Sequence, residues 1–114
     1  MHGIAELPTY IRLADKLLSP QERQDLIGYP AAHPEAGDIM EGTGGVRKLR
    51  WHRGGRGKSA GVRVIYYYHD DLMPLYLLAL FAKGDKADLT KAERNELAAL
   101  VDVLVNIWKG RAKS

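Results

Sequence analysis

Residues 42–69 combine a complete absence of acidic residues with apolar and aromatic residues at strand spacing. This stretch holds seven of the seventeen Lys and Arg residues of the chain. The other ten face fourteen Asp and Glu, so the rest of the chain carries a net charge of −4 although the whole is +3. Charge segregated in this way on ordered strands predicts a basic surface whose natural ligand is a polyanion.

Three consecutive segments in the middle of the chain have strand character. Basic and apolar side chains alternate along residues 46–53. One side of this strand carries Leu49 and Trp51, and the other carries Lys48, Arg50 and His52. Residues 62–69 are rich in β-branched and aromatic types, and residues 75–82 form a continuous apolar run. A turn signal of aspartates and proline separates these two, so the three segments predict an antiparallel meander.

The first third of the chain predicts a short strand and two helices. Residues 4–7 form the candidate strand, and residues 10–18 place apolar side chains at helical spacing. Ser19 and Glu22 then have the spacing of a capping box, which marks a fresh helix start. We expect this second helix to end in the segment 28–37, which is rich in Pro and Gly.

A further capping box, Thr90 with Glu93, predicts a C-terminal helix that runs to about residue 109, with a frayed tail at 110–114. The expected fold class is therefore α+β: two N-terminal helices, a twisted antiparallel sheet (a short first strand plus a three-stranded meander) and a C-terminal helix. We expect the helices to lie on one face of the sheet. The length of 114 residues predicts a single domain, residues 1–114.

Several function classes are disfavoured by the composition. The chain has no cysteine, and its four histidines lack metal-ligand spacing, so no metal and no cofactor is expected. The longest apolar run, residues 74–82, is too short to span a bilayer, and the first residues do not read as a signal peptide. We expect a cytoplasmic protein. The triplet Gly57-Lys58-Ser59 resembles a phosphate-binding loop, but His52 stands where that motif requires glycine.

Strand alternation selects Lys48 and Arg50 as phosphate-facing residues, and Arg63 can join them from the start of the next strand. RNA suits such a surface, because its phosphates need cations and its unstacked bases need planar partners. The alternative is that the basic edge serves solubility and that the tyrosines pack in the core. The further candidates for contacts with RNA or phosphate are Arg47, Arg53, Arg56, Lys58, Lys86 and Tyr67.

His52 lies in the middle of the basic strand. Neighbouring cations favour its neutral form, which can accept a proton, so a role as general base is conceivable. The alternative is an ordinary surface histidine.

The string GTGG–RKLRW–GxRVIYYY–AKGDKADLT resembles the HigB-type toxins of the RelE/ParE superfamily, from bacterial type II toxin–antitoxin systems. The resemblance implies a toxin that cleaves mRNA in the ribosomal A site and a cognate antitoxin, expected to be a helix-turn-helix protein of the HigA kind. Carried over by motif, Lys48, Arg50 and Arg63 would hold the scissile phosphate or assist the attacking hydroxyl. Lys83, with Lys86, would add contacts from the next loop.

The chain departs from the superfamily at one position. Where a relative places a tyrosine proposed as general acid, this sequence reads Asp88-Leu89-Thr90, and Thr90 is better explained as a helix cap. The candidates for general acid and base are therefore His52, Lys48 and Lys83, in no fixed order.

Two other function classes stay open at this stage. The ParE branch of the superfamily consists of inhibitors that bind DNA gyrase without catalysis. The chain could also be an inactive orphan that only binds an antitoxin. The focused phosphate-binding strand favours the endoribonuclease over both.

Overall fold

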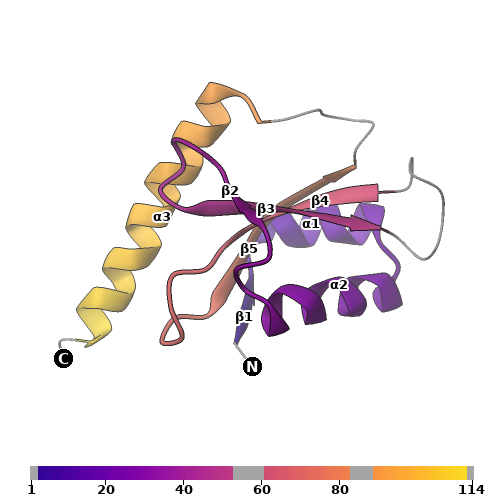
Figure 1. Ribbon diagram of the computed structural model, residues 1–114, viewed down its shortest axis with the longest axis horizontal. Coiled ribbons are helices and arrows are strands. Elements are labelled where there is room, and N and C mark those ends of the chain that lie inside the picture. The colour runs from indigo at the N-terminus through magenta and orange to yellow at the C-terminus, as the bar shows by residue number, and fades with distance from the viewer. Residues whose placement is uncertain (1–2, 53–60, 83–88, 113–114) are drawn as a thin grey trace.

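A computed structural model of the chain describes residues 3–52, 61–82 and 89–112. Helices and strands are both present in these ranges, and the predicted α+β class is confirmed (Figure 1). In chain order the elements are β1 (Ile4–Glu6), α1 (Pro8–Leu17), α2 (Pro20–Ala32), β2 (Asp38–Ile39), β3 (Val46–His52), β4 (Gly61–Tyr67), β5 (Leu75–Ala82) and α3 (Lys91–Ala112).

The strands form one sheet in the order β1-β5-β4-β3-β2. β3, β4 and β5 pair antiparallel with their neighbours in sequence, so the predicted meander is confirmed. β1 also forms, but it pairs parallel to β5, so the sheet is mixed rather than wholly antiparallel. The sequence does not predict β2, because a strand of two residues is too short to show alternation; it pairs with β3 at the opposite edge.

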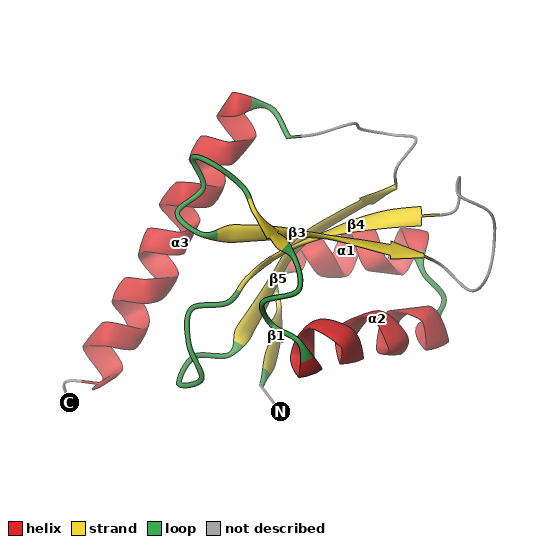
Figure 2. Cartoon of the chain, viewed as in Figure 1, coloured by secondary structure: helices red, strands yellow, loops and turns green. Residues whose placement is uncertain are grey.

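Helices cover both faces of the sheet, so the expectation that they share one face is wrong (Figure 2). Tyr10 of α1 and Leu26 of α2 pack with Val64 of β4 in one apolar cluster, which we call the α1/α2 core. Val101 of α3 packs with Ile65 of β4 in a second, the α3 core. Successive residues of β4 are thus buried on opposite faces, and its run of apolar side chains reflects this two-sided burial.

Both predicted capping boxes are confirmed. The Ser19 hydroxyl accepts a hydrogen bond from the Glu22 amide at 3.1 Å, and the Glu22 carboxylate accepts one from the Ser19 amide at 2.8 Å. Thr90 and Glu93 make the same reciprocal pair at 3.1 and 2.8 Å. These bonds satisfy amide groups that a helix start otherwise leaves without partners.

α2 ends where the sequence predicts, whereas α3 extends further than predicted. α2 continues through Gly28 and Pro30 and ends at Ala32, inside the segment 28–37 where the sequence predicts its end. Pro30 is buried inside α2, so burial of its ring outweighs its poor helix propensity. α3 passes Gly110 and ends at Ala112, inside the segment expected to fray. Among the described residues, no helix is both long enough and apolar enough to cross a bilayer.

Candidate functional site

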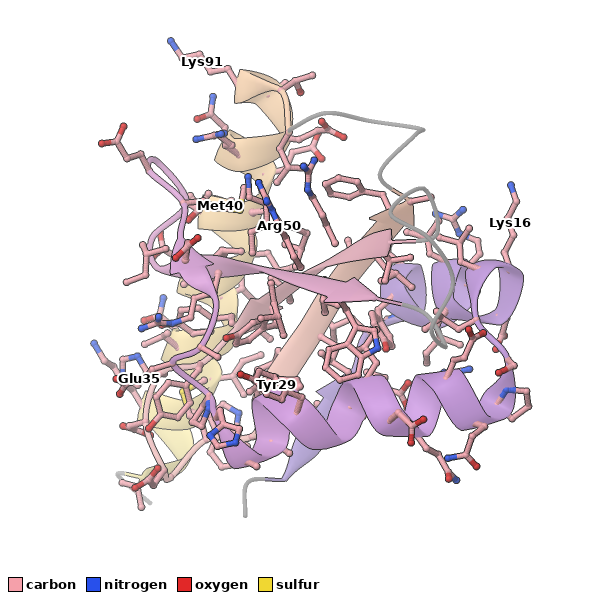
Figure 3. All side chains as sticks on the ribbon, turned by 45° about the vertical axis from the view of Figure 1, so that its right-hand side comes forward. Lys16, Tyr29, Glu35, Met40, Arg50 and Lys91 are labelled. Atoms are coloured by element: carbon pink, nitrogen blue, oxygen red, sulfur yellow. The ribbon has the colours of Figure 1, made fainter. Side chains whose placement is uncertain are left out.

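The alternation predicted for β3 places its basic side chains on one face. Leu49 is buried in the α1/α2 core, and Trp51 packs against that core. Lys48 and Arg50 fall on the opposite face, which also carries Val46 of the α3 core. In Figure 3 the labelled Arg50 and the α2 residue Tyr29 lie on opposite sides of the β3 ribbon. The basic side of β3 therefore shares its face of the sheet with α3.

The sheet register brings Arg50 and Arg63 directly opposite each other. Such partners in an antiparallel pair have Cβ atoms about 4.5–5.5 Å apart. Arg63 is in turn opposite Phe81 of β5, which packs on the α3 core. Lys48 pairs with Ile65 two residues along the same face. The structure thus brings together the three cations that the sequence selects, and we call Lys48, Arg50 and Arg63 the cationic row.

The fold also brings one carboxylate to this row. Asp38 of β2 is the cross-strand partner of Lys48 and therefore points to the same face. Its side chain is exposed. Sequence reasoning misses this neighbour because Asp38 lies outside the acid-free stretch and in a strand that the sequence does not predict. The cationic row therefore has an acidic neighbour at its Lys48 end.

Arg47 does not belong to the cationic row. It alternates with Lys48 and so projects from the other face of β3, where its guanidinium donates hydrogen bonds to the Glu35 carbonyl at 3.1 Å and the Gly37 carbonyl at 2.8 Å. These bonds fix the connection between α2 and β2. Its position favours a structural role over the predicted contact with phosphate.

The GTGG motif forms the turn that leads into β3. Gly42, Gly44 and Gly45 have φ angles of 74°, 78° and 112°, a region that side chains other than glycine rarely adopt. The Thr43 hydroxyl is buried; it donates to the Met40 carbonyl at 2.7 Å and accepts from the Val46 amide at 3.0 Å. The motif therefore sets where β3 begins, and with it the register of the cationic row.

The three consecutive tyrosines differ in their surroundings. Tyr66 is fully buried, and its hydroxyl accepts from the Gly37 amide and donates to the Pro34 carbonyl, each at 2.9 Å. Burial raises the pKa of Tyr66 and of Tyr67. Tyr67 is only 5% exposed, and its hydroxyl is hydrogen-bonded to His69 Nδ1 at 2.9 Å.

Packing therefore explains both buried rings. We do not include Tyr67 among the residues proposed to contact RNA, because its ring is almost wholly buried. The Tyr68 hydroxyl donates to Asp71 at 3.0 Å, and this hydrogen bond raises the pKa of Tyr68.

Several predicted contacts lie outside the described part of the chain. The backbone of His52 pairs with Gly61 at the end of β3, but its side chain is not among those described. Five further predicted residues lie wholly outside the described ranges, namely Arg53, Arg56, Lys58, Lys83 and Lys86. Within the described ranges, no three His, Asp or Glu side chains come together as a group that could hold a metal ion.

Residues 32–111 match the family model described as the RelE toxin of the RelE/RelB toxin–antitoxin system. The match covers more than half of the 114-residue chain and runs from the end of α2 almost to the end of α3. It includes the whole cationic row and leaves out α1.

Proposed function

Because the chain belongs to the RelE toxin family, the toxin components of toxin–antitoxin systems, we propose that it is an mRNA endonuclease that acts on the translating ribosome. The observation that carries this proposal is the pairing of Arg50 with Arg63, with Lys48 beside them. Two guanidinium groups on neighbouring strands can bind the oxygens of one phosphate together, which is the contact that cleavage of RNA requires.

The chemistry that suits this site is cleavage of RNA by its own 2′-hydroxyl. The 2′-oxygen attacks the adjacent phosphorus, the bond to the 5′-oxygen breaks, and the products carry a 2′,3′-cyclic phosphate and a 5′-hydroxyl. The reaction needs a base for the hydroxyl proton, cations for the charge that develops on phosphorus, and an acid for the leaving oxygen. No protein nucleophile and no metal ion takes part.

Arg50 and Arg63 would supply the cations in this scheme. One guanidinium group can bind two phosphate oxygens at once, and it stays charged at any working pH. Two such groups can therefore stabilise the negative charge of the transition state. His52, Lys48 and Lys83 are the candidates for the two proton transfers. The ribosome would add orientation of the mRNA, which lowers the barrier without further side chains.

The partner of such a toxin is an antitoxin. We propose that it is a helix-turn-helix protein of the HigA kind, in keeping with the HigB-type string in the sequence. Co-purification with the product of the neighbouring reading frame would test this part independently of cleavage.

One experiment tests the proposed function. Purified toxin is added to a translating extract, and mRNA 5′ ends are mapped by primer extension. We expect ribosome-dependent cuts, and an Arg63→Ala variant should lower their rate by about 100-fold or more. Arg12→Ala is the matched control, because Arg12 is an exposed arginine of α1, outside the residues that match the family.

The proposal is contradicted if mRNA stays intact while DNA gyrase is arrested, which would support a ParE-like inhibitor. An mRNA with 2′-deoxyribose in the nucleotide on the 5′ side of the cleaved bond tests the chemical step. It should bind the ribosome normally and resist cleavage, because it lacks the attacking hydroxyl. Cutting of that message would exclude attack by the 2′-hydroxyl.

A further inference from the structure

A row of three aromatic rings lies on the other side of β3 from the cationic row. The ring centroids of Tyr29 and Trp51 are 5.6 Å apart and those of Tyr29 and His33 are 4.9 Å apart, with interplanar angles of 47° and 46°. Tyr29 is 41% exposed. The sequence does not predict that these three rings meet, because they come from the end of α2 and from β3, which are brought together only in the fold.

A hollow opens beside these rings. Its volume is about 340 Å³, and it is lined by Tyr29, Leu49, Arg50 and Trp51. This volume is at the lower end of the range for sites that bind small ligands, roughly 300–1,000 Å³, and suits one planar ring system. Because Arg50 also belongs to the cationic row, the hollow and the row meet at this residue.

The edge of β3 joins the two sites. β2 pairs only with Arg47 and Lys48, and among the described strands none continues along this edge from Leu49 to the end of β3. A single-stranded RNA bound across this edge could run from Arg50 to the rings without meeting a neighbouring strand. The two sites are thus separated only by the thickness of one strand.

Packing alone does not account for Tyr29. The side chains of α2 that are buried are Leu26, Pro30 and Ala31, and Tyr29 is not among them. The segment that follows α2 is nevertheless held firmly, because Tyr66 and Arg47 bind its backbone. The Tyr29 ring also contacts those of Trp51 and His33, and rings that already contact each other lose little conformational entropy when a ligand binds.

We propose that the hollow lined by Tyr29, Leu49, Arg50 and Trp51 takes one unstacked base of a single-stranded RNA, which stacks on an exposed ring face while its neighbouring phosphate contacts Arg50. This inference rests on the proposed function and names a contact that positions the message. Aromatic side chains beside a cationic groove are the common means of binding single-stranded RNA without reading its sequence. The site therefore discriminates little between bases.

Tryptophan fluorescence tests the proposal directly. The chain has two tryptophans, so Trp108→Phe leaves Trp51 as the only reporter. The probe is a single-stranded RNA of about ten nucleotides, made with 2′-O-methyl groups so that it cannot be cut. We expect it to quench Trp51, whereas inorganic polyphosphate, which carries the charge without bases, should bind without quenching.

Variants of Tyr29 separate stacking from charge. Tyr29→Ala should weaken RNA binding about ten-fold or more and leave the salt dependence of the affinity unchanged. Tyr29→Phe keeps the ring and should bind like the parent. Tyr29→Leu keeps apolar volume without a π face and should behave like the alanine variant. Ile11→Ala, which removes an exposed apolar side chain of α1, is the control, and the unfolding midpoint of each variant shows that it folds.

The outcomes distinguish this proposal from the proposed function. RNA that leaves Trp51 unquenched at saturation, or that binds Tyr29→Ala as tightly as the parent, overturns the base site even if ribosome-dependent cleavage is observed. Quenching that depends on Tyr29 supports the base site even if no mRNA is cut. If Tyr29→Ala loses binding to the antitoxin and keeps full affinity for RNA, the hollow is a protein contact and the proposal is wrong.

Discussion

Arg50 and Arg63 face each other as direct partners across the β3–β4 pair. Their mutual repulsion means that the sheet holds two like charges at a position where most strands place a neutral or opposite pair. The same feature that favours binding of phosphate should therefore lower stability in its absence.

Arg50→Gln tests whether the repulsion between the two arginines lowers stability. At low salt the free energy of unfolding should rise by up to about 1 kcal/mol, because one of two opposed charges is removed. Added salt should shrink the difference, since it screens the repulsion in the parent. Urea unfolding at two salt concentrations measures both effects, with Arg12→Gln as control. A loss of stability in Arg50→Gln would show that repulsion across the pair is not significant.

Gly37→Ala should destabilise the protein by about 1–3 kcal/mol. A Cβ at this position would lie 2.9 Å from the Tyr66 hydroxyl and 3.1 Å from the backbone oxygen of Lys48, and neither atom can move without breaking a buried contact. Gly28→Ala is the matched control. Its Cβ would meet nothing within 4 Å inside α2, so helix propensity should raise stability by about 0.5–1 kcal/mol. Thermal unfolding of both variants should show shifts of opposite sign.

Tyr10→Phe should not lower stability at neutral pH. The Tyr10 ring is fully buried in the α1/α2 core, and its hydroxyl has no hydrogen-bond partner among the described residues. Removing a polar group that is buried without a partner takes away an unfavourable term of about 1–3 kcal/mol. Chemical unfolding at pH 7 is the measurement, and a clear loss of stability would mean that the hydroxyl has a partner.

The same variant should change stability at alkaline pH. Burial above all, then the charge of Glu6, raises the pKa of Tyr10 to about 12, against 10.0 in an unfolded chain. A raised pKa in the folded state means that the unfolded chain loses its proton first, so the parent loses stability as pH rises from 10 to 12. The loss is about 1.4 kcal/mol for each pH unit in that window. Tyr10→Phe should flatten this part of the stability profile, and an unchanged slope would contradict the assignment.

Asp38→Asn should tighten binding of single-stranded RNA by about two- to five-fold at low salt, because a carboxylate is removed beside Lys48. Fluorescence anisotropy of a labelled RNA measures the affinity, and Asp25→Asn in α2 is the control for a change of net charge far from the row. Cleavage on the ribosome should not fall. A variant that binds RNA more tightly and yet cuts slowly would place Asp38 in proton transfer.

The local signals of the sequence predict much of this structure. Alternation along 46–52 gives the face of Lys48 and Arg50 correctly, and the two capping boxes mark the starts of α2 and α3. The sequence does not predict the contacts between elements that lie far apart in the chain. The apolar runs of β4 and β5 do not say which helix covers which face, and the expectation that all helices share one face is therefore wrong.

The candidate site shows the same limit. The pairing of Arg50 with Arg63 depends on register, and the turn that sets it depends on the buried Thr43 hydroxyl. Arg47 reads as one more cation in the sequence, yet its guanidinium binds backbone carbonyls on the other face. Tyr29 and Trp51 are twenty-two positions apart in the chain and meet only because α2 packs against β3.

The cationic row and the two apolar cores share no residue. A protein that loses the exposed Arg50 side chain therefore keeps every buried side chain, and its unfolded fraction does not rise. Cellular proteases remove proteins largely in proportion to that fraction, so they would spare such a variant. Inactivating mutations of Arg50 would escape protein quality control, and the silenced protein would accumulate to the same level as active copies.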